Sequence, residues 1–461
     1  MFGLMIGFPS SQSGKSPAAR NGDRIALGML GLAAVLRLAA IFGLRSYLTT
    51  ETAYEHHVIA MNLIMGHGFS FPFFGPAVPT SQQAPFVPLL LAACYAMFGV
   101  GHPLALLLFQ VLATVASVAT VYGVSEIAGS IGGKRPRLLA GFGCAVYPAF
   151  VISVTHIQAV PFVTTWLVLM VLWGFRTAED FRPRNLVILG VWAALGALTD
   201  PILLLPAALT LGYLAIVLKP RAGWRGVARC VGLMASIVML ATMPWTIRNW
   251  VVHQRLVPIK DSFWYVLWQG NGPEASGTDK LMHPQRESDP QPSVMDLAGR
   301  HRMLLRERRR SVSVDSVLPA EFRARLAAMP TEIERMDAFG HRIRDFLRKN
   351  PGHYLRMCLR RLKYFVTFDP TNPKSGHPLY RLSYLVAAGS GLVGAVLTRS
   401  QWRRLILVFG AMVGIALPSI LIITSARFRL PAEAFLIVLG AVGVARLMSA
   451  LDHRVGMRPA G

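Results

Sequence analysis

The fold depends on residues 45–103, which read RSYLTTETAYEHHVIAMNLIMGHGFSFPFFGPAVPTSQQAPFVPLLLAACYAMFGVGHP. They follow a long apolar run, 25–44, and end in a shorter one, 85–99. Four ionisable side chains lie close together in this stretch: Glu51, Glu55, His56 and His57. A transmembrane helix needs about 20 apolar residues, so the run 85–99 is too short to cross a bilayer comfortably. Whether it crosses decides on which side of the membrane every later loop lies.

The composition is that of a membrane protein. Of the 461 residues, 53% are hydrophobic and 15% are charged, whereas soluble domains carry about 25% charged residues. The apolar residues fall in runs of roughly 15 to 24, which is the length of transmembrane helices. The first run, 25–44, is too long for the core of a signal peptide, so we interpret it as a retained span. These patterns exclude a soluble globular protein.

The formal net charge is +24, and much of the excess lies in loops. In a membrane protein such loops meet lipid headgroups and phosphates, so we expect membrane lipids as partners and no nucleic acid. The four cysteines have no metal-ligand spacing, and we interpret those in apolar runs as small hydrophobic side chains. They are Cys94, Cys144, Cys230 and Cys358.

The apolar runs predict ten full spans, at residues 25–44, 103–126, 138–154, 159–175, 186–199, 201–218, 228–246, 380–397, 405–423 and 430–450. If 85–99 does not cross, the basic short loops all fall on the cytoplasmic side, as the positive-inside rule requires. These loops lie around residues 134–137, 176–184, 219–229 and 399–404. We therefore predict an all-α polytopic fold with both termini cytoplasmic, in which 85–99 is a half-inserted or surface-lying helix.

This topology divides the chain into a tail 1–24, a transmembrane module 25–246 with a first external loop 45–102, a mainly helical external domain 247–379, transmembrane helices 380–450 and a tail 451–461. In the external domain, residues 336–349 have helical apolar spacing. Residues 354–368 alternate basic and apolar side chains, which is typical of an amphipathic helix at the membrane interface. Residues 273–295 are rich in turn formers, and the basic segment 300–325 has no assigned role.

Glu51 is the candidate catalytic residue. A carboxylate at the membrane surface can deprotonate an acceptor hydroxyl or hold a metal ion that does so. The alternative is that Glu51 caps a helix over residues 52–66, because acids favour helix N-termini. His56 is a candidate metal ligand, with a plain surface position as the alternative. A carboxylate beside histidines at the membrane surface suggests an active site for a lipid-borne substrate.

Basic residues in two external segments are candidates for binding phosphate or pyrophosphate. Arg248 and Lys260 follow the seventh span, where the alternative for Arg248 is snorkelling among belt aromatics. Arg427 and Arg429 lie in a very short external loop that the positive-inside rule disfavours. Either an anionic ligand or an acidic partner such as Glu433 would compensate for their charge.

Two short external turns carry weaker candidates. Asp200 precedes Pro201 and either has a functional role near the bilayer or caps the next helix. His156 lies on the turn between the third and fourth spans. The sequence contains no Asp-x-Asp pair and no Rossmann or Walker glycine loop, so we do not expect a soluble nucleotide-bound donor.

Several motifs resemble bacterial family 39-type glycosyltransferases, which belong to the GT-C class together with protein O-mannosyltransferases and the lipid A aminoarabinose transferase. They are Ile59-Ala60-x-Asn62-Leu63-x-x-Gly66-His67-Gly68-Phe69-Ser70, Ala84-Pro85-x-x-Pro88-Leu89-Leu90-Leu91-Ala92, Pro244-Trp245-Thr246-Ile247-Arg248-Asn249, Gly270-Asn271, Asn350-Pro351 and Asp369-Pro370-Thr371-Asn372-Pro373. The likeness extends over most of residues 25–450.

The resemblance implies an inverting transfer from a polyprenyl-phosphate sugar to a lipid, glycan or protein acceptor. It places the active site on the periplasmic face of the bacterial cytoplasmic membrane. The acid of the first external loop, as catalytic base or metal ligand, maps onto Glu51. Arg427, Arg429, Arg248 and Lys260 would hold the phosphate, and Tyr54 and Gln83 join them as substrate-binding candidates.

The sequence departs from the family on the turn between the third and fourth spans. Many relatives carry a second acid there, but this turn has no carboxylate, so a two-acid site for a divalent metal would need His156 instead. Two alternatives to a transferase therefore stay open. One is a transporter or flippase for polyprenyl-linked saccharides, and the other is an inactive scaffold that binds lipid carriers.

Overall fold

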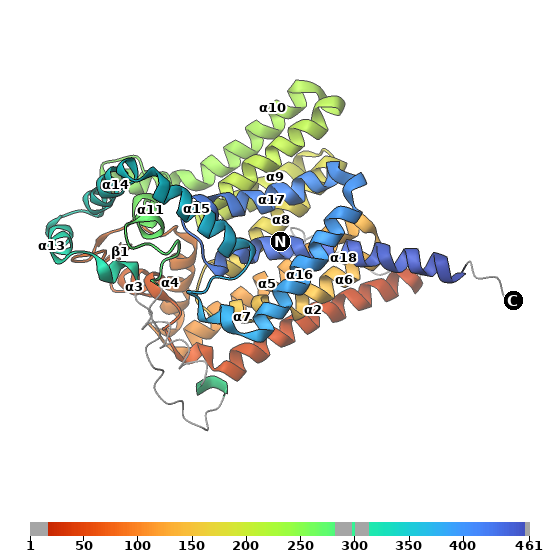
Figure 1. Cartoon of the computed structure of the whole chain (residues 1–461), viewed down its shortest axis with the longest axis horizontal. Coiled ribbons are helices and arrows are strands. Elements are labelled where there is room, and N and C mark those ends of the chain that lie inside the picture. Colours follow the sequence, from red (N-terminus) through yellow and green to blue (C-terminus); the bar gives the residue numbers. More distant parts are fainter. Residues whose placement is uncertain (1–16, 282–296, 300–312, 457–461) are drawn as a thin grey trace.

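Long apolar helices dominate the computed structural model, which describes residues 17–281, 297–299 and 313–456 (Figure 1). The outer parts of both predicted tails, residues 282–296 of the turn-rich segment and residues 300–312 of the basic segment lie outside the described residues. Seven helices in the described part are long and apolar enough to cross a membrane. The predicted all-α polytopic class is therefore confirmed.

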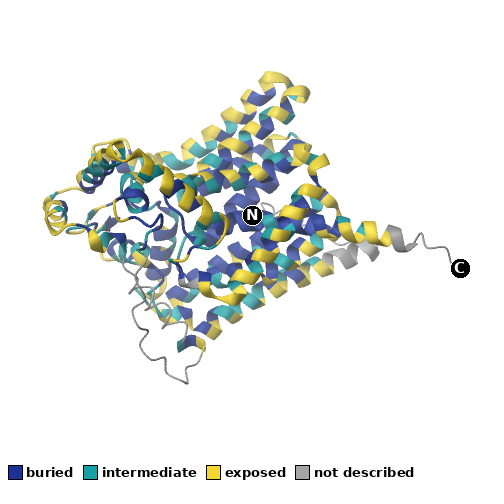
Figure 2. Ribbon diagram, viewed as in Figure 1, coloured by how far each residue is buried: buried dark blue, intermediate teal, exposed yellow. Residues whose placement is uncertain are grey.

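The bundle is built from ten helices of the described residues. They are α2 Pro17–Leu44, α5 Pro103–Gly132, α6 Lys134–Val146, α7 Pro148–Ser153, α8 Val160–Glu179, α9 Pro183–Thr199, α10 Leu204–His253, α16 Pro378–Leu397, α17 Trp402–Leu421 and α18 Ala426–Gly456. Figure 2 shows buried residues along the inside of this bundle and exposed residues on its outside. Several exposed side chains are large and apolar, such as Ile216, Met239 and Leu240 on α10, as expected of a surface that faces lipid.

The other elements connect or cap the bundle helices. They are η1 Ser46–Leu48, α3 Tyr54–Ile64, β1 Ser70–Phe71, β2 Val78–Pro79, α4 Phe86–Phe98, η2 Pro201–Leu203, α11 Phe263–Asn271, η3 Val314–Val317, α13 Ala320–Ala328, α14 Glu332–Lys349, α15 Pro351–Val366, η4 Pro373–Gly376 and η5 Arg399–Gln401. Strands β1 and β2 pair antiparallel, with Ser70 opposite Pro79.

The predicted spans 201–218 and 228–246 are two legs of one element, α10. Its hydrogen-bonded run of 50 residues bends at Gly223, whose φ of 61° lies in the left-handed region that glycine adopts without strain. The seven long apolar helices include α10 as one element. When its second leg, helix α9 and the broken helix α6–α7 are added, the bundle is consistent with about ten predicted crossings.

The predicted span 138–154 is broken into α6 and α7. Tyr147 has extended backbone between them and Pro148 begins α7, because proline supplies no backbone N–H to continue the preceding helix. The break leaves the buried ring of Tyr147 pointing its hydroxyl at Glu433 of α18, 2.7 Å away.

Helices α16 and α18 pack closely together through small residues. A Cβ atom on Gly394 would overlap the carbonyl oxygen of Leu439, and one on Gly440 would overlap the side chain of Ser390. Small residues of this kind let membrane helices approach each other closely, where van der Waals contact holds them together.

The run 85–99 forms the 13-residue helix α4, which packs against α3 and α5. It is shorter than a span, and its apolar side chains Leu89 and Met97 are 45% and 67% exposed. The helix is therefore as predicted, and its depth in the membrane stays a prediction.

The two ends of the bundle differ (Figure 1). We call the end that carries residues 45–102 and the described residues of 254–377 the loop end. Here α11, α13, α14 and the first loop enclose a small hydrophobic core of their own, which includes Phe73, Trp268 and Phe339. The opposite end, with the α5–α6, α8–α9 and α16–α17 connections, is called the turn end.

Helix α15 at the loop end confirms the predicted amphipathic pattern. Its apolar side chains Leu355, Leu359, Leu362 and Val366 are 43–61% exposed, while Arg361 is fully buried. The spacing of the exposed set puts it on one face of the helix. We expect this apolar face to lie in the membrane interface, where such helices are stabilised.

Candidate active site

The segment around Glu51 is an extended turn rather than a helix cap. Helix α3 begins at Tyr54, and its N-cap residue is Ala53, which makes no side-chain capping bond. The capping role considered for Glu51 is therefore wrong. Its backbone N–H donates to Thr49 Oγ1 at 3.1 Å, and one oxygen of its half-buried carboxylate is shielded from solvent.

One hydrogen bond between buried groups joins the Glu51 segment to the turn that holds His156. Ile157 donates its backbone N–H to Thr52 Oγ1 at 3.2 Å. His156 is fully buried, and its Nδ1 atom lies 3.0 Å from Thr155 Oγ1. The structure thus brings the segment of Glu51, the candidate acid, next to the turn of His156, the possible replacement for the second acid.

Three sequence-predicted residues from different elements are close enough for their charges to interact: His56 of α3, Lys260 of the loop after α10 and Arg427 of α18. Burial, together with the positive charges of Lys260 and Arg427, lowers the pKa of His56 to about 3. The imidazole is therefore neutral at physiological pH and adds no positive charge beside Lys260 and Arg427. Within the described residues, His56 Nδ1 has no hydrogen-bond partner.

Arg427 and Arg429 have different surroundings although they are two residues apart. Arg429 donates to Glu433 at 2.7 Å and to the carbonyl groups of Phe365 and Thr367. Its side chain is 4% exposed and that of Glu433 is 0% exposed. The acidic partner considered for this arginine is therefore the one found.

Arg427 is half-buried and stacks on the ring of Phe428, with 5.1 Å from its guanidinium carbon to the ring centroid. Its Nε atom makes no hydrogen bond to any residue in the described part of the chain. Of the two arginines, Arg427 is thus the one with hydrogen-bonding capacity left for a phosphate. The phosphate-binding role of both stays a prediction.

The Arg248 side chain points into the first loop and not out to the membrane surface. It donates to the carbonyl groups of Phe69 and Thr80 at 2.9 and 2.7 Å, and its guanidinium lies 5.0 Å from the ring of Trp245. The snorkelling considered for Arg248 is therefore wrong. Its contacts hold the first loop against α10, and its role in phosphate binding stays a prediction.

The loop that carries Lys260 is fixed by the end of α10. Trp245 Nε1 donates to the Ile259 carbonyl at 3.0 Å, and Asn249 donates to the Val257 carbonyl at 2.9 Å. These bonds place Lys260 where its charge acts on His56. Two residues of the Pro244–Asn249 motif, Trp245 and Asn249, thus hold the loop that carries Lys260.

The remaining sequence-predicted residues are Tyr54, Gln83 and Asp200. Tyr54 is exposed and begins α3 with a φ of 45°. Gln83 is half-buried, two residues after Ser81, whose carbonyl accepts from Asp261 N–H at 2.8 Å. Asp200 accepts from Ile202 N–H at 3.2 Å and caps η2, so the structural alternative for it is confirmed.

Two of the buried charged residues that were not anticipated bear on the candidate site. Glu332 at the start of α14 accepts from the Thr80 hydroxyl and from Ser81 N–H, at 2.7 Å for the latter. Burial raises its pKa to about 7, although both hydrogen bonds act in the opposite direction. Its partners are about 250 positions away in the chain, so no local pattern could have revealed this contact.

Arg361 of α15 is the second. It donates to the carbonyl groups of Ile420 and Gly270, at 2.6 and 2.7 Å, and to Asn271 Oδ1 at 2.9 Å. These bonds fix the segment between α17 and α18 that leads to Arg427. The only signal in the sequence was the Gly270-Asn271 motif, which gave no hint of its partner.

No group of three His, Cys, Asp or Glu side chains in the described residues is arranged to hold a metal ion. The metal role of Glu51, His56 and His156 stays a prediction.

Comparison with known proteins shows which fold the chain has. Residues 82–247 match the model of the family described as dolichyl-phosphate-mannose-protein mannosyltransferase. The whole fold is similar to the oligosaccharyltransferase of Archaeoglobus fulgidus, with a TM-score of 0.55 at 14% identity over 94% of this chain and 52% of that one. The chain has the GT-C fold.

Two further GT-C structures are similar. The archaeal oligosaccharyltransferase AglB from Archaeoglobus fulgidus, in complex with an inhibitory peptide and a dolichol-phosphate, gives a TM-score of 0.54 at 14% identity over 94% of this chain and 52% of that chain. ArnT from Cupriavidus metallidurans, bound to undecaprenyl phosphate, gives 0.41 at 14% identity over 92% and 79%. No curated protein matches the sequence significantly. This GT-C chain spans about half the length of the oligosaccharyltransferases.

Proposed function

We propose that the chain is an inverting glycosyltransferase that moves a sugar from a polyprenyl-phosphate carrier to an acceptor hydroxyl at the loop end. The observation that carries this proposal is that Lys260 and Arg427, from two separate segments, lie near enough to act electrostatically on His56, five residues after Glu51. The reaction removes a proton from the acceptor oxygen, for which a carboxylate can be the base. It leaves negative charge on the phosphate oxygen, which two cations can stabilise.

The GT-C fold supports a lipid-linked donor. The AglB structure with the same fold contains a dolichol-phosphate, and a polyprenyl phosphate would present one phosphate to the protein from the membrane. Helix α15, with its exposed apolar face, lies at the same end of the bundle (Figure 1). We place this end on the periplasmic face of a bacterial cytoplasmic membrane, because the basic turn end then lies inside.

The proposed chemistry is a single displacement at the anomeric carbon. Glu51 accepts the proton of the acceptor hydroxyl. At the same time the oxygen of this hydroxyl bonds to the anomeric carbon from the face opposite the phosphate. The bond between that carbon and the phosphate oxygen breaks, and its electron pair leaves with the phosphate. Arg427 and Lys260 stabilise the charge that develops there, a term that is often the largest in catalysis. His56 stays neutral and adds no charge.

The test is transfer by the Glu51→Gln variant, with Glu55→Gln as its matched control. Glu55 lies in the first turn of α3, four residues from Glu51. The full-length protein is reconstituted in liposomes with radiolabelled polyprenyl-phosphate mannose and an envelope extract as acceptor source. We expect Glu51→Gln to insert and fold normally but to transfer label about 1,000-fold more slowly, since it lacks the base. Near-normal transfer by Glu51→Gln would remove Glu51 from this role.

The same liposomes distinguish the alternatives of flippase and scaffold. Label that moves onto an acceptor, with release of polyprenyl phosphate, supports a transferase. Label that crosses the bilayer unchanged identifies a flippase, and label that is only retained by the protein identifies a scaffold. Repeating the assay with pentose and other hexose donors then defines the sugar.

A further inference from the structure

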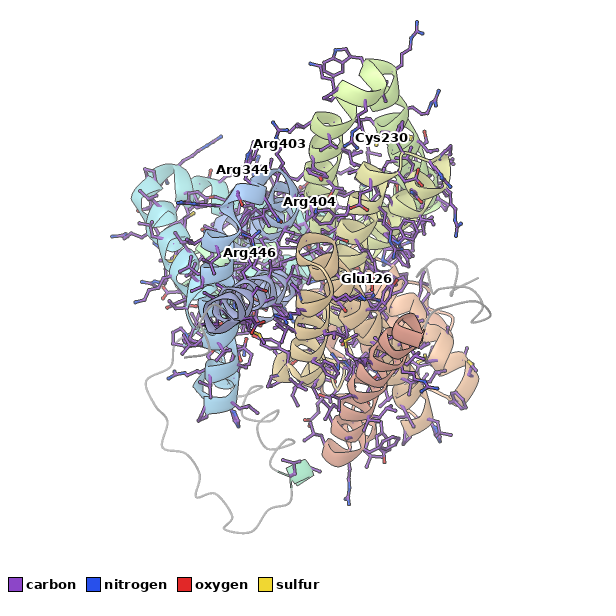
Figure 3. All side chains as sticks on the ribbon, turned by 90° about the vertical axis from the view of Figure 1, so that its right-hand side faces the viewer. Glu126, Cys230, Arg344, Arg403, Arg404 and Arg446 are labelled. Carbon is purple, nitrogen blue, oxygen red and sulfur yellow. The ribbon has the colours of Figure 1, made fainter. Side chains whose placement is uncertain are left out.

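A cavity of about 460 Å³ opens at the turn end of the bundle, opposite the candidate active site. It lies between the α5–α6 turn, η5 and the last turns of α18. Figure 3 looks onto this end and shows Arg403, Arg404 and Arg446 there. Ligand pockets have volumes of about 300 to 1,000 Å³, so this cavity is large enough to hold the polar part of a ligand.

The lining of the cavity combines cations with apolar and neutral polar groups. Its polar side chains are Lys134, Arg135, Gln401, Arg446 and Ser449. Apolar residues such as Val442 complete it. A pocket that offers both cations and apolar surface suits an amphiphile whose polar group is an anion.

Hydrogen bonds hold part of this lining in place without a ligand. Arg446 donates to the carbonyl of Leu397. Gln401, with its amide in the orientation that satisfies both partners, accepts from Arg446 at 3.0 Å and donates to the Ile131 carbonyl at 3.2 Å. Arg446 is thus anchored to α16 and η5, and its charge is fixed beside the cavity.

The cations around the cavity outnumber the acids. Asp452 pairs with Arg135 at 2.7 Å, and Glu126 pairs with Arg137 at 2.5 Å. Within the described residues, no acidic side chain forms an ion pair with Lys134 or Arg446. A second hollow of about 560 Å³ beside this one is lined by Arg403 and Arg404. An anion would therefore be attracted to this part of the surface.

We propose that this cavity binds the phosphate-bearing headgroup of an anionic membrane phospholipid. Basic pockets between membrane helices attract such headgroups, because each Lys or Arg gains electrostatic energy close to the anionic lipid. The ligand would contact both the α5–α6 turn and α18, two parts of the bundle that are far apart in the sequence. It would thereby stabilise the packing of the turn end.

The surroundings favour a lipid over a free phosphate ion, although both carry the same charged group. The ring of Trp402 next to Gln401 is 57% exposed, and Leu447 and Met448 on α18 are 47% and 45% exposed. Acyl chains can pack against such apolar side chains while the phosphate meets the cations. A free phosphate would gain nothing from them.

Native mass spectrometry of the full-length protein in detergent tests the proposal. The protein is titrated with phosphatidylglycerol, with cardiolipin and with zwitterionic phosphatidylcholine. We expect the two anionic lipids to bind in preference to phosphatidylcholine. In the Lys134→Gln/Arg135→Gln double variant, anionic-lipid affinity should fall about 30-fold, since two cations contribute to headgroup attraction.

A matched control removes two cations elsewhere at the turn end. Arg184 and Arg225 are exposed and do not line the cavity, so Arg184→Gln/Arg225→Gln has the same net charge as the test variant and should bind lipid like the wild type. A second test variant, Ser449→Trp, fills the cavity and keeps every cation. It should weaken anionic-lipid binding as well.

Three results would overturn the proposal. One is equal binding of anionic lipid by the wild type and by the Lys134→Gln/Arg135→Gln variant. Another is an equal loss in the control variant, which would show a general effect of surface charge. The third is displacement of bound lipid by millimolar inorganic phosphate, which would assign the cavity to a soluble anion.

Discussion

Three arginine side chains at the loop end and two at the turn end of the bundle have opposite environments. At the loop end Arg335, Arg361 and Arg429 are 1%, 0% and 3% exposed, and carbonyl groups or a carboxylate surround each guanidinium. At the turn end the Arg135 and Arg182 side chains are 57% and 75% exposed, and each pairs with an aspartate on the surface.

This difference shows how one residue type serves two purposes. A buried guanidinium fits only where every N–H finds an acceptor, so it fixes the surrounding backbone rigidly. The loop end needs such rigidity because its candidate site is assembled from separate segments: the first loop, the loop after α10 and the start of α18. An exposed guanidinium keeps its hydration and binds weakly but adaptably, which suits contact with lipid headgroups.

The largest effect is expected from the buried pair of Arg429 and Glu433. Arg429→Met leaves Glu433 charged and without its ion-pair partner in a buried position, so we expect the variant to lose about 3 to 5 kcal/mol of stability. Arg427→Met, two residues away, should lose less than about 1 kcal/mol. Thermal unfolding of the two variants in detergent makes the comparison, and equal stabilities would contradict it.

Sugar transfer should be lowered by Arg427→Met even though this variant loses less stability than Arg429→Met. A general disturbance of α18 would not produce this result. Arg427→Met keeps its fold but should lower sugar transfer about 100-fold, because one donor to the developing phosphate charge is lost. Arg255, paired on the surface of the loop end with Asp337, provides a matched control. Arg255→Met should transfer sugar at the wild-type rate.

A smaller effect is expected from Glu332, whose pKa is raised to about 7 by burial. The folded state favours the protonated form, so its contribution to stability is complete below the ordinary glutamate pKa. That contribution is lost as the pH rises through about 7. Between about pH 5 and pH 8 the wild type should lose up to about 3 kcal/mol from this group. Unfolding temperatures across this range measure the loss.

The Glu332→Gln variant is the control for this pH dependence. Its amide can still accept from Ser81 N–H and can donate to the Thr80 hydroxyl, and it does not titrate. Stability of the variant should therefore change less than that of the wild type over the same pH range. An identical pH dependence in both proteins would show that another group is responsible.

The smallest effect is expected at the turn end, from the pair of Arg135 and Asp452. Both side chains are more than half exposed, and such pairs contribute about 0 to 1 kcal/mol. A double-mutant cycle with Arg135→Gln and Asp452→Asn, measured in lipid-free detergent, should give a coupling below about 0.5 kcal/mol. A coupling of about 3 kcal/mol, as large as the stability loss expected for Arg429→Met, would contradict the proposed difference between the two ends.

Much of the fold could be predicted because it depends on local sequence. Apolar runs located the spanning helices, and the alternation of basic and apolar residues located α15. The pairing of Arg429 with Glu433 was also within reach, because residues four apart face each other on a helix. The details that failed are backbone breaks, such as the division of α6 from α7 at Tyr147, where one proline overrides an apolar run.

The candidate site was predicted in its parts but not in its assembly. Glu51, His56, Lys260 and Arg427 were each named from residue type and position near a membrane surface. Their mutual placement depends on Arg361 and Glu332, whose partners lie far away in the chain. A sequence pattern indicates contacting partners only when they are close together in the sequence, so these contacts were missed.

The sequence by itself determined that the chain crosses a membrane many times, since a run of about 20 apolar residues must leave water whatever its neighbours are. It also determined which end of the bundle carries the long loops. Only the tertiary structure decided that Arg429 is enclosed by Glu433 and two carbonyl groups, while the Nε atom of Arg427 has no hydrogen-bond partner among the described residues. The reason is physical: the environment of a charge is set by the atoms packed around it, and here these atoms come from segments hundreds of residues apart.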